Sequence, residues 1–373
     1  MHRDHRRLVL RSRLGPRVVT WRSKRLVVQE DMQRRQLGKT DLHVPPIVFG
    51  STSLGNLYTA IPDDVQLSIV KEWFEHVENP VFIDSAGKYG AGLSLENIGR
   101  HLQALNVAPE DVVISNKLAW VRTLLETEEP TFEPGVWVDL KYDAVQDISY
   151  DGMFRCYEQG NELLGDYSAQ LVSVHDPDEY LAAARDKADL ASRWEDISEA
   201  YRALQELKRD GHVAAIGVGA KDWKTVRDVA QRFPLDWVMI ANSFTVHSHP
   251  SELVDFIREM KAQNTSVINS AVFNGGFLVG GDFYNYRRVD ADLEDDRKLL
   301  DWRTEFFAVC DELKVKPAEA CIAFGKRLEG VESLALSSSR SERVASNVEL
   351  ATRELPDSFW NTLRDRGLID IEW

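Results

Sequence analysis

The chain has 373 residues, with 45 Lys and Arg against 60 Asp and Glu, and a formal net charge of −15 at neutral pH. The length allows one large α/β barrel or two ordinary domains, and the acidity argues against a nucleic-acid partner because phosphates would be repelled. No apolar run approaches the roughly 18 residues of a membrane span, and three widely spaced cysteines without a C-x-x-C pair favour a reducing, cytoplasmic location.

The first 31 residues differ in charge from the rest of the chain. They carry nine Lys and Arg against three acids, a net charge of +6, which leaves −21 on residues 32–373. Such a segment is compatible with a transit peptide, with an arm that binds nucleic acid or membrane, or with a disordered extension. We expect the last of these, including an upstream start codon with Met32 as the natural beginning, because Met32 directly precedes the first recognisable element. The expected division is therefore an extension over 1–31 and a barrel over 32–373.

The predicted elements begin with a small hairpin over residues 36–44, where two short strand segments flank a glycine-containing turn. Near-continuous apolar runs, typical of parallel strands covered on both faces, then alternate with amphipathic helices. The strands are predicted at 47–51, 81–86, 112–118, 170–175, 214–219, 237–244, 267–273 and 333–337. Helices are predicted at 63–76, 94–104, 152–164, 192–210, 223–233, 251–262 and 317–328, with Asp63 and Ser94 as N-caps and Pro317 at a helix start.

Eight strands that alternate with helices predict the α/β class and a (β/α)8 TIM barrel, preceded by the hairpin and followed by extra C-terminal helices. A doubly wound sheet is the alternative, but such a sheet would typically show a G-x-G-x-x-G turn after its first strand. The segment 50–55 does not have that spacing. Residues 119–150 and 176–191 are expected to be extended loops over the C-terminal ends of the strands, where barrel enzymes select substrates.

Four ionisable residues fall at or just beyond predicted strand ends: Asp84, Tyr89, Lys117 and His175. The carboxyl ends of barrel strands share one rim, so we expect these side chains to converge. A tyrosine beside a lysine that is anchored by a carboxylate is suited to act as a general acid with a lowered pKa. Each residue alone has an ordinary structural explanation, but the four together predict an oxidoreductase of carbonyl and alcohol groups.

A metal site is not expected. His247 and His249 lie two residues apart, but no third ligand stands in a matching motif, so a polar loop explains them better. The cysteines Cys156, Cys310 and Cys321 lie in helical patterns rather than at strand ends. We therefore expect three inert thiols.

Several motifs together resemble the aldo-keto reductase superfamily, over nearly the whole chain from about Gln36. They are Asp84-Ser-Ala-x-x-Tyr89-Gly, Gly92-x-Ser94, Asn116-Lys117, His175-Asp176-Pro177, Ile216-Gly-Val-Gly219 and Glu342-Arg343 with Asn347. The His-Asp-Pro-Asp sequence and the Phe359-Trp-x-x-Leu motif are most similar to the branch of L-fucose and D-threo-aldose 1-dehydrogenases.

The resemblance implies a role for each of the four rim residues. Tyr89 would exchange a proton with the substrate oxygen, and Lys117 would lower the pKa of that tyrosine. Asp84 would hold the lysine, and His175 would orient the carbonyl group by a hydrogen bond. The implied activity is oxidation of an aldose at C1, or reduction of a small polar aldehyde, by direct NAD(P)-dependent hydride transfer, which belongs to carbohydrate metabolism.

At the cofactor site the sequence matches the family pattern less completely. The family's Ser-Asn after the fifth strand is Gly219-Ala220 here, and the family's 2′-phosphate lysine is Ser337, whereas its arginine is matched. A helix N-terminus after the last strand suits a phosphate. We therefore expect NADP or NAD, with NADP slightly favoured. The implied cofactor-binding residues are Gly219, Asn242, Asn269, Ser270, Gly275, Gly276, Ser337, Ser338, Ser339, Arg340, Arg343 and Asn347.

Tyr58, Trp120 and Trp137 are the candidate substrate-binding residues. The two tryptophans are equally well explained as sugar-stacking surfaces and as loop anchors, and polar, acid-rich loops favour a hydroxylated substrate. A broad-specificity aldehyde reductase or a pyridoxal-type aldehyde dehydrogenase on the same site is the alternative enzyme. The non-enzyme alternative is a cofactor-binding regulatory barrel, which the Gly219-Ala220 departure favours and the intact set of four rim residues opposes.

Overall fold

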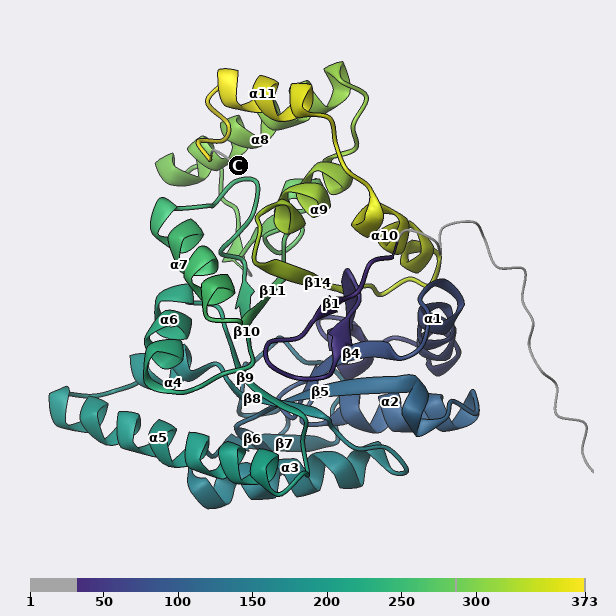
Figure 1. The fold of residues 1–373 in the computed structure, drawn as a ribbon, viewed down its shortest axis with the longest axis vertical. Helices are drawn as coiled ribbons and strands as arrows, with labels where there is room; N and C mark the ends of the chain where they lie inside the picture. Colours follow the sequence, from purple (N-terminus) through teal and green to yellow (C-terminus); the bar gives the residue numbers. More distant parts are fainter. Residues whose placement is uncertain (1–31, 286, 372–373) are drawn as a thin grey trace, which may run out of the picture.

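A closed barrel of eight parallel strands forms the centre of the protein, as predicted (Figure 1). The computed structural model describes residues 32–285 and 287–371, so the expected extension over 1–31 lies outside the described residues. The barrel strands are β3 (Ile47–Gly50), β4 (Val81–Ala86), β5 (Val112–Leu118), β8 (Leu171–His175), β9 (Ala215–Ala220), β10 (Trp237–Ala241), β11 (Ser266–Ser270) and β14 (Val331–Ser337).

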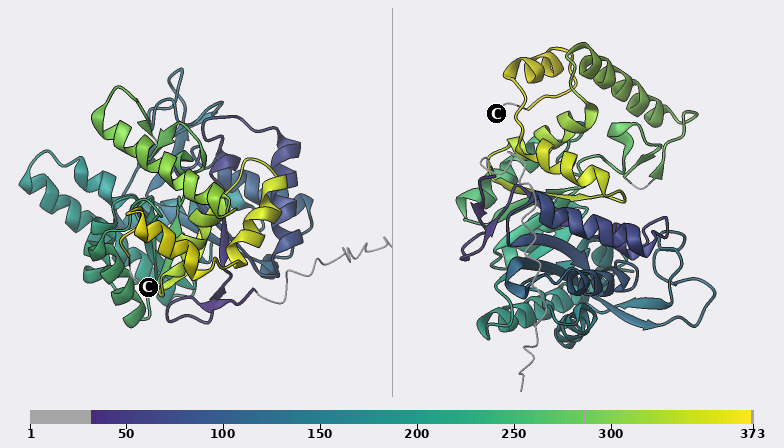
Figure 2. Two further views of the ribbon diagram at one scale, coloured as in Figure 1. Left: turned by 90° about the horizontal axis from the view of Figure 1, so that it is seen from above. Right: turned by 90° about the vertical axis from the view of Figure 1, so that its right-hand side faces the viewer.

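The seven predicted helices are all present and surround the barrel (Figures 1 and 2). They are α1 (Asp63–His76), α2 (Leu93–Ala104), α3 (Tyr150–Leu164), α5 (Lys187–Arg209), α6 (Trp223–Arg232), α7 (Ser251–Ala262) and α9 (Pro317–Arg327). Helix α5 starts earlier than predicted because Asp186 caps it, accepting hydrogen bonds from the amides of residues 188 and 189. The extra C-terminal helices are α10 (Glu342–Thr352) and α11 (Asp357–Asp365).

Two further helices were not predicted. Helix α4 (Pro177–Ala182) fills part of the expected loop after β8, and α8 (Glu294–Glu312) follows no barrel strand, so the strand-helix alternation gave no sign of it. Helix α8 packs with α11 beyond α9 (Figure 1). None of the helices in the described part of the chain is long and apolar enough to cross a membrane.

The predicted N-terminal hairpin is confirmed as β1 (Arg35–Gln36) paired antiparallel with β2 (His43–Val44). Leu37 and Val44 are fully buried and pack against inward-facing side chains of the strands, including Phe82 and Trp237. The hairpin therefore closes the N-terminal end of the barrel, which leaves the opposite rim for the site.

Two predicted N-caps are wrong. Asp63 is already the first helical residue of α1 after Pro62, whose ring fixes the entry of the chain, and no side chain caps this helix. The hydroxyl of Ser94 lies inside α2 and donates to the Ser51 carbonyl at 2.8 Å, so it ties α2 to the end of β3. The prediction that Pro317 opens a helix is confirmed.

The segment 119–150 is more ordered than the extended loop we expected. It contains an antiparallel pair, β6 (Trp120–Leu124) and β7 (Tyr142–Gln146), and it projects from the barrel in the right-hand view of Figure 2. Arg122 anchors it through Nε, which donates to the Ala91 carbonyl at 2.6 Å. We call residues 125–141, between these strands, the insertion segment.

The chain after β11 also leaves the barrel before α8. It forms a short 3₁₀ turn, η4 (Phe277–Val279), and a small hairpin of β12 (Phe283–Tyr284) and β13 (Arg287–Arg288). This part projects to the same side of the molecule as β6 and β7 (Figure 2). The C-terminal rim is thus flanked by two excursions of the chain.

Candidate active site

The structure brings the four predicted rim residues together. Asp84 lies near the end of β4, Lys117 near the end of β5 and His175 at the end of β8, which are consecutive strands of the barrel. Tyr89 lies in the turn between β4 and α2, and its backbone carbonyl accepts from the amide of Ser94 at 3.2 Å. Parallel pairing of neighbouring strands therefore places these side chains at one rim, as predicted.

Lys117 and Asp84 form a buried ion pair. The lysine Nζ lies 2.5 Å from Oδ2 of Asp84 and donates to the Ser85 carbonyl at 3.2 Å, and both charged side chains are almost fully buried. The same Nζ lies 4.9 Å from the centre of the Tyr89 ring. A fixed positive charge at this distance stabilises negative charge that develops on the phenol oxygen.

His175 packs edge-on against Tyr89, with ring centres 5.7 Å apart and an interplanar angle of 80°. Burial, together with the positive charges of Lys117 and Lys88, holds the pKa of His175 well below its ordinary value. The ring is therefore neutral and offers a single N–H donor. Its buried Nδ1 has no hydrogen-bond partner in the described structure.

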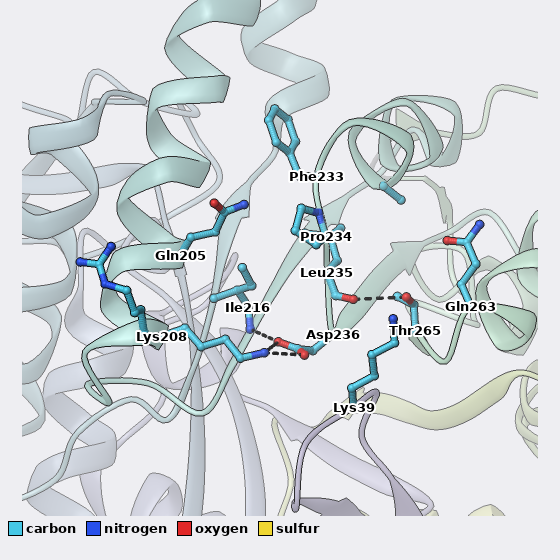
Figure 3. Close-up of a pocket in the computed structure, with 12 residues that line it drawn as sticks. Lys39, Gln205, Lys208, Ile216, Phe233, Pro234, Leu235, Asp236, Gln263 and Thr265 are labelled. Atoms are coloured by element: carbon cyan, nitrogen blue, oxygen red, sulfur yellow. Dashed lines mark hydrogen bonds and ion pairs between the residues drawn. The ribbon is translucent and has the colours of Figure 1, made fainter.

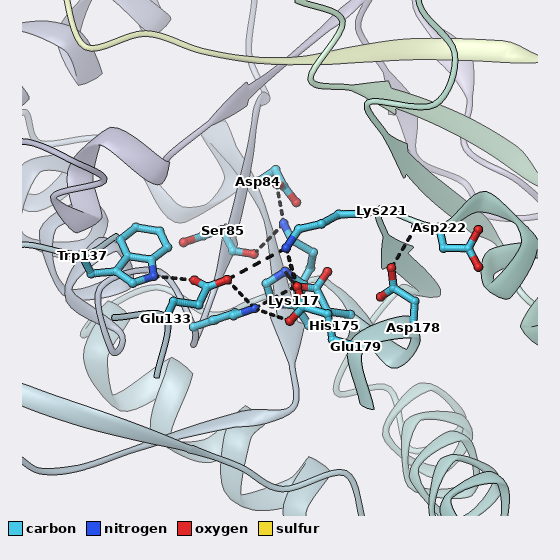
Figure 4. A network of polar contacts seen from close by, with 12 residues as sticks. Asp84, Ser85, Lys117, Glu133, Trp137, His175, Asp178, Glu179, Lys221 and Asp222 are labelled. Atoms are coloured by element: carbon cyan, nitrogen blue, oxygen red, sulfur yellow. Dashed lines mark hydrogen bonds and ion pairs between the residues drawn. The ribbon is translucent and has the colours of Figure 1, made fainter. Parts of the chain in front are cut away.

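A cluster of charged side chains borders these residues and was missed by the sequence analysis (Figure 4). Lys88, directly before Tyr89, forms ion pairs with Glu133 at 2.8 Å, Asp176 at 3.0 Å and Glu179 at 2.8 Å. Burial opposes the charge, but the three carboxylates outweigh it and raise the pKa of Lys88 above its usual value. Lys221, after β9, pairs with Glu179 at 2.5 Å. The acids that follow His175 (Asp176, Asp178 and Glu179) were the only sequence signal for this cluster.

The three candidate substrate residues lie at different depths. The Trp137 ring lies against Tyr89, with centres 5.7 Å apart, so it borders the site directly. Trp120 packs against Phe132, and its indole centre lies 5.1 Å from Nζ of Lys88. Tyr58 is 48% exposed at the rim and stacks on Phe283 at 6.4 Å. Trp137 is thus the candidate best placed to meet a substrate.

The residues proposed for the nicotinamide end occupy the strands beyond His175. Gly219 pairs with His175 in register, and a Cβ here would lie 3.0 Å from Cδ of Lys117, so the glycine leaves room for the lysine. Asn242, just after β10, has a buried Oδ1 without a partner in the described structure. Ser270 donates to the Ile240 carbonyl at 3.1 Å. An amide donor of a ligand would satisfy the Asn242 oxygen.

Asn269 does not fit the cofactor role. Its Nδ2 donates to the carbonyl of Phe244 at 2.8 Å and to that of Gly325 in α9 at 3.0 Å. The side chain therefore points to the outer face of β11, where it joins the strand to a helix. Sequence analysis also missed Asn274, whose Nδ2 donates to the Asn242 carbonyl at 3.1 Å and so holds the loop after β11 near the site.

The remaining cofactor candidates lie on the two loops that flank this half of the rim. Gly275 and Gly276 adopt left-handed backbone conformations before η4, with φ of 73° and 94°. The Ser53 hydroxyl donates to the Ser338 carbonyl at 2.8 Å, which fixes the loop before α10. No side chain caps α10; the amides of Arg343 and Val344 donate to the carbonyls of Arg340 at 3.2 Å and Ser341 at 3.0 Å, and the positive end of the helix dipole at this start favours an anion. Around this helix start lie Ser337, Ser339, Arg340, Arg343 and Asn347, all exposed or half-buried.

Other features flagged in the sequence have structural roles. His247 Nδ1 lies 2.9 Å from the Tyr284 hydroxyl, and His249 Nε2 lies 2.8 Å from Asp370. Across residues 32–285 and 287–371, no group of three or more His, Cys, Asp or Glu could hold a metal ion. Burial raises the pKa of Cys156 and of Cys310 to about 12 and that of Cys321 well above its usual value, which favours unreactive thiols.

A separate cavity of about 530 Å³ opens at the other end of the barrel (Figure 3). Its walls include Asp236, the residue before β10, whose carboxylate pairs with Lys208 at 2.5 Å and accepts from the amide of Ile216 at 2.9 Å. Because these residues lie at the N-terminal ends of the strands, the cavity is remote from Tyr89.

Several histidines have lowered pKa values in the fold, and we therefore expect the protein to lose stability in mild acid. Burial lowers the pKa of His175 and of His249, and it lowers that of His247 to about 4. Below the ordinary histidine pKa of about 6.5 the unfolded chain binds protons that the folded chain does not, so the free energy of unfolding should fall from pH 7 to pH 5. Urea unfolding at both pH values should show a smaller fall for His247→Gln. An identical fall would show that His247 is not responsible.

The fold is that of a TIM barrel, and the comparisons with known proteins assign it to an oxidoreductase family. The model of the aldo/keto reductase family matches residues 46–366, and the chain belongs to this family. It is similar to pyridoxal 4-dehydrogenase of Microbacterium luteolum, 28% identical over 90% of this chain and 98% of the relative. It is also similar to D-threo-aldose 1-dehydrogenase of a Pseudomonas species, 26% identical over 88% of this chain and 95% of the relative.

Solved structures show the same fold. An aldo-keto reductase from Bacillus halodurans in its holo form superposes with a TM-score of 0.65 at 20% identity, covering 90% of this chain and 96% of that one. A glycerol dehydrogenase from Gluconobacter oxydans gives a TM-score of 0.64 at 17% identity, covering 91% and 95%.

Proposed function

We propose that this enzyme is an NAD(P)-dependent dehydrogenase of compounds that form a cyclic hemiacetal, with an aldose oxidised at C1 as the leading substrate. The observation that carries the proposal is the buried Lys117–Asp84 pair, whose ammonium lies 4.9 Å from the ring of Tyr89 beside a neutral His175. Two relatives are named for dehydrogenation of D-threo-aldoses and of pyridoxal, and both compounds carry an aldehyde with a hydroxyl group placed to close a ring.

In the oxidative direction, Tyr89 accepts the proton of the substrate hydroxyl as the C–O bond becomes C=O. Lys117 stabilises the phenolate form that accepts this proton, and Asp84 holds the lysine in place. His175 donates its N–H to the same substrate oxygen. A bound nicotinamide dinucleotide supplies the acceptor for the hydride that leaves the hemiacetal carbon. Reduction of an aldehyde follows the reverse path, with Tyr89 as the proton donor.

The residues of the other half of the rim suit this cofactor. The unpaired Asn242 oxygen would accept from the nicotinamide carboxamide, and the glycine turn at 275–276 would pass over the pyrophosphate. The helix dipole at the start of α10 and the hydroxyl groups of Ser337 and Ser339 would favour a phosphate there, whereas the Ser338 hydroxyl already donates to the Arg340 carbonyl at 2.7 Å. Pyridoxal-type oxidation is the second candidate, favoured by the 28% identical relative.

A substrate panel tests the proposal. Aldoses of different configuration, pyridoxal and small aldehydes are assayed with NAD and with NADP by the absorbance of the reduced cofactor. We expect the highest kcat/KM with a compound that forms a cyclic hemiacetal, and no oxidation of the matching methyl glycoside, which has no free anomeric hydroxyl. Tight cofactor binding without turnover on any member would instead support the regulatory barrel.

Cofactor choice leads to a specific prediction. A 2′-phosphate at the start of α10 would meet the exposed guanidinium of Arg343, whose forked donors suit phosphate. Arg343→Ala should weaken NADP binding by about 1–3 kcal/mol and NAD binding far less. Fluorescence titration measures both affinities, and Arg353→Ala, at the other end of the same helix, is the control. Equal losses of affinity for the two cofactors would show that Arg343 does not bind the 2′-phosphate.

A further inference from the structure

The ammonium of Lys88 joins three separate parts of the rim. Its carboxylate partners are Glu133 in the insertion segment, Asp176 directly after β8 and Glu179 in α4. Lys88 itself lies in the Tyr89 turn and is 2% exposed. An ammonium has three N–H donors, and each carboxylate lies within 3.0 Å of the nitrogen, so the group is fully used. A buried ammonium costs free energy unless such partners compensate its charge. Lys88 therefore requires that these three parts of the rim stay together.

Glu133 connects Lys88 to the aromatic side chains that border the site, Trp137 and Tyr89. One of its carboxylate oxygens pairs with Lys88, and the other accepts from Nε1 of Trp137 at 2.6 Å. The ring of Trp137 in turn lies on Tyr89. A continuous chain of contacts therefore runs from Lys88 through Glu133 and Trp137 back to the tyrosine next to Lys88.

The backbone at Glu133 shows that this position is held by its contacts. Its φ is +44°, in the left-handed region that a residue with a Cβ adopts only at a cost in free energy. The segment is also joined to the barrel by the backbone of Tyr58, which donates to the Val136 carbonyl at 2.8 Å, and by a β-bridge between Leu57 and Trp137. Glu133 contributes the charged contact among them.

We propose that Lys88 and Glu133 are positioning residues that hold the insertion segment over Tyr89, so that Trp137 completes the substrate-binding wall. The inference rests on the proposed function, because it assigns the wall to the substrate of that site. The cofactor candidates Asn242 and Arg343 follow β10 and β14, on the other half of the barrel. Loss of the contact should therefore weaken substrate binding and leave cofactor binding unchanged.

Glu133→Gln is the variant that best isolates the contact. The surrounding cluster has two ammonium groups, Lys88 and Lys221, and without the charge of Glu133 it keeps the two carboxylates Asp176 and Glu179. The variant is thus balanced in charge and should fold. We expect KM for the best substrate to rise roughly 10-fold, the factor that corresponds to losing a charge-assisted hydrogen bond, with a much smaller change in kcat.

Lys88→Met should have a larger effect in the same direction, a loss of roughly 10- to 100-fold in kcat/KM, because the wall is misplaced. Lys88→Arg keeps the charge and the donors, and it should recover part of the loss. Lys208→Met is the matched control, since it also removes an ammonium from a buried carboxylate, Asp236, but at the other end of the barrel. It should lower stability without changing KM.

Hydrogen exchange supplies a readout that needs no turnover. In Glu133→Gln and Lys88→Met the amides of residues 125–141 should exchange faster than in the parent enzyme, while those of β4 and β5 stay protected. An unchanged KM, or exchange in the segment that matches the Lys208→Met control, would overturn the proposal. If no compound is turned over, the proposed function fails. Faster exchange confined to residues 125–141 would still show that Lys88 and Glu133 hold the insertion segment in place.

Discussion

Replacing Tyr89 by phenylalanine should lower kcat by about 10²–10⁴-fold, the range typical of losing a general acid or base. The substitution removes one oxygen atom and leaves the ring, so the contacts of that ring with Trp137 and His175 can be kept. The phenol has no part in holding a dinucleotide in our proposal, and cofactor affinity should stay near the parent value. Steady-state kinetics on the best substrate and cofactor titration measure the two quantities.

Tyr167→Phe is the control for this prediction. Its hydroxyl also makes a hydrogen bond, to the Val107 carbonyl at 2.8 Å, but it lies away from the rim. This variant should keep full turnover. Near-parent kcat in Tyr89→Phe would mean that another group moves the proton, and the roles assigned to Lys117 and Asp84 would then lose their basis.

Lys117→Met should abolish activity and also destabilise the fold, by about 3–5 kcal/mol. The substitution leaves the carboxylate of Asp84 almost fully buried with its charge uncompensated, since Lys117 is its ion-pair partner at 2.5 Å. Urea unfolding measures the stability change, provided that the transition is two-state.

The double variant Lys117→Met with Asp84→Asn separates the two roles of this pair. Removing both charges takes away the unpaired carboxylate, so most of the lost stability should return. Activity should not return, because no cation then stabilises the phenolate of Tyr89. Full activity in the double variant, or an unchanged unfolding free energy in Lys117→Met alone, would contradict this account.

The barrel and the four rim residues could be predicted from the sequence because each depends on local pattern. Apolar runs marked the strands, and Asp84, Lys117 and His175 stood where such runs ended. Parallel pairing then fixed their convergence without any knowledge of individual contacts.

The features that were missed depend on contacts between distant segments. Lys88 meets Glu133 and Glu179, which are 45 and 91 positions further along the chain, and no local pattern joins them. The β6–β7 pair is stabilised by cross-strand partners such as Val121 and Val145, whose runs are short and mixed with charges.

The misplacement of Asn269 could have been avoided by a periodicity argument. Successive residues of a strand point to opposite faces, so Asn269 and Ser270 could not both face the inside of the barrel. Ile268 packs in the inner cluster closed by the hairpin, which puts Asn269 on the outer face and Ser270 on the inner one.

The hairpin of residues 35–44 has a consequence for how reactants reach the proposed site. Leu37 and Val44 pack against inward-facing side chains at one end of the barrel, and the barrel interior is itself filled by side chains, so no route to Tyr89 runs through that end. In the proposed reaction the dinucleotide and the sugar would therefore both approach from the C-terminal rim, and both would leave by the same side.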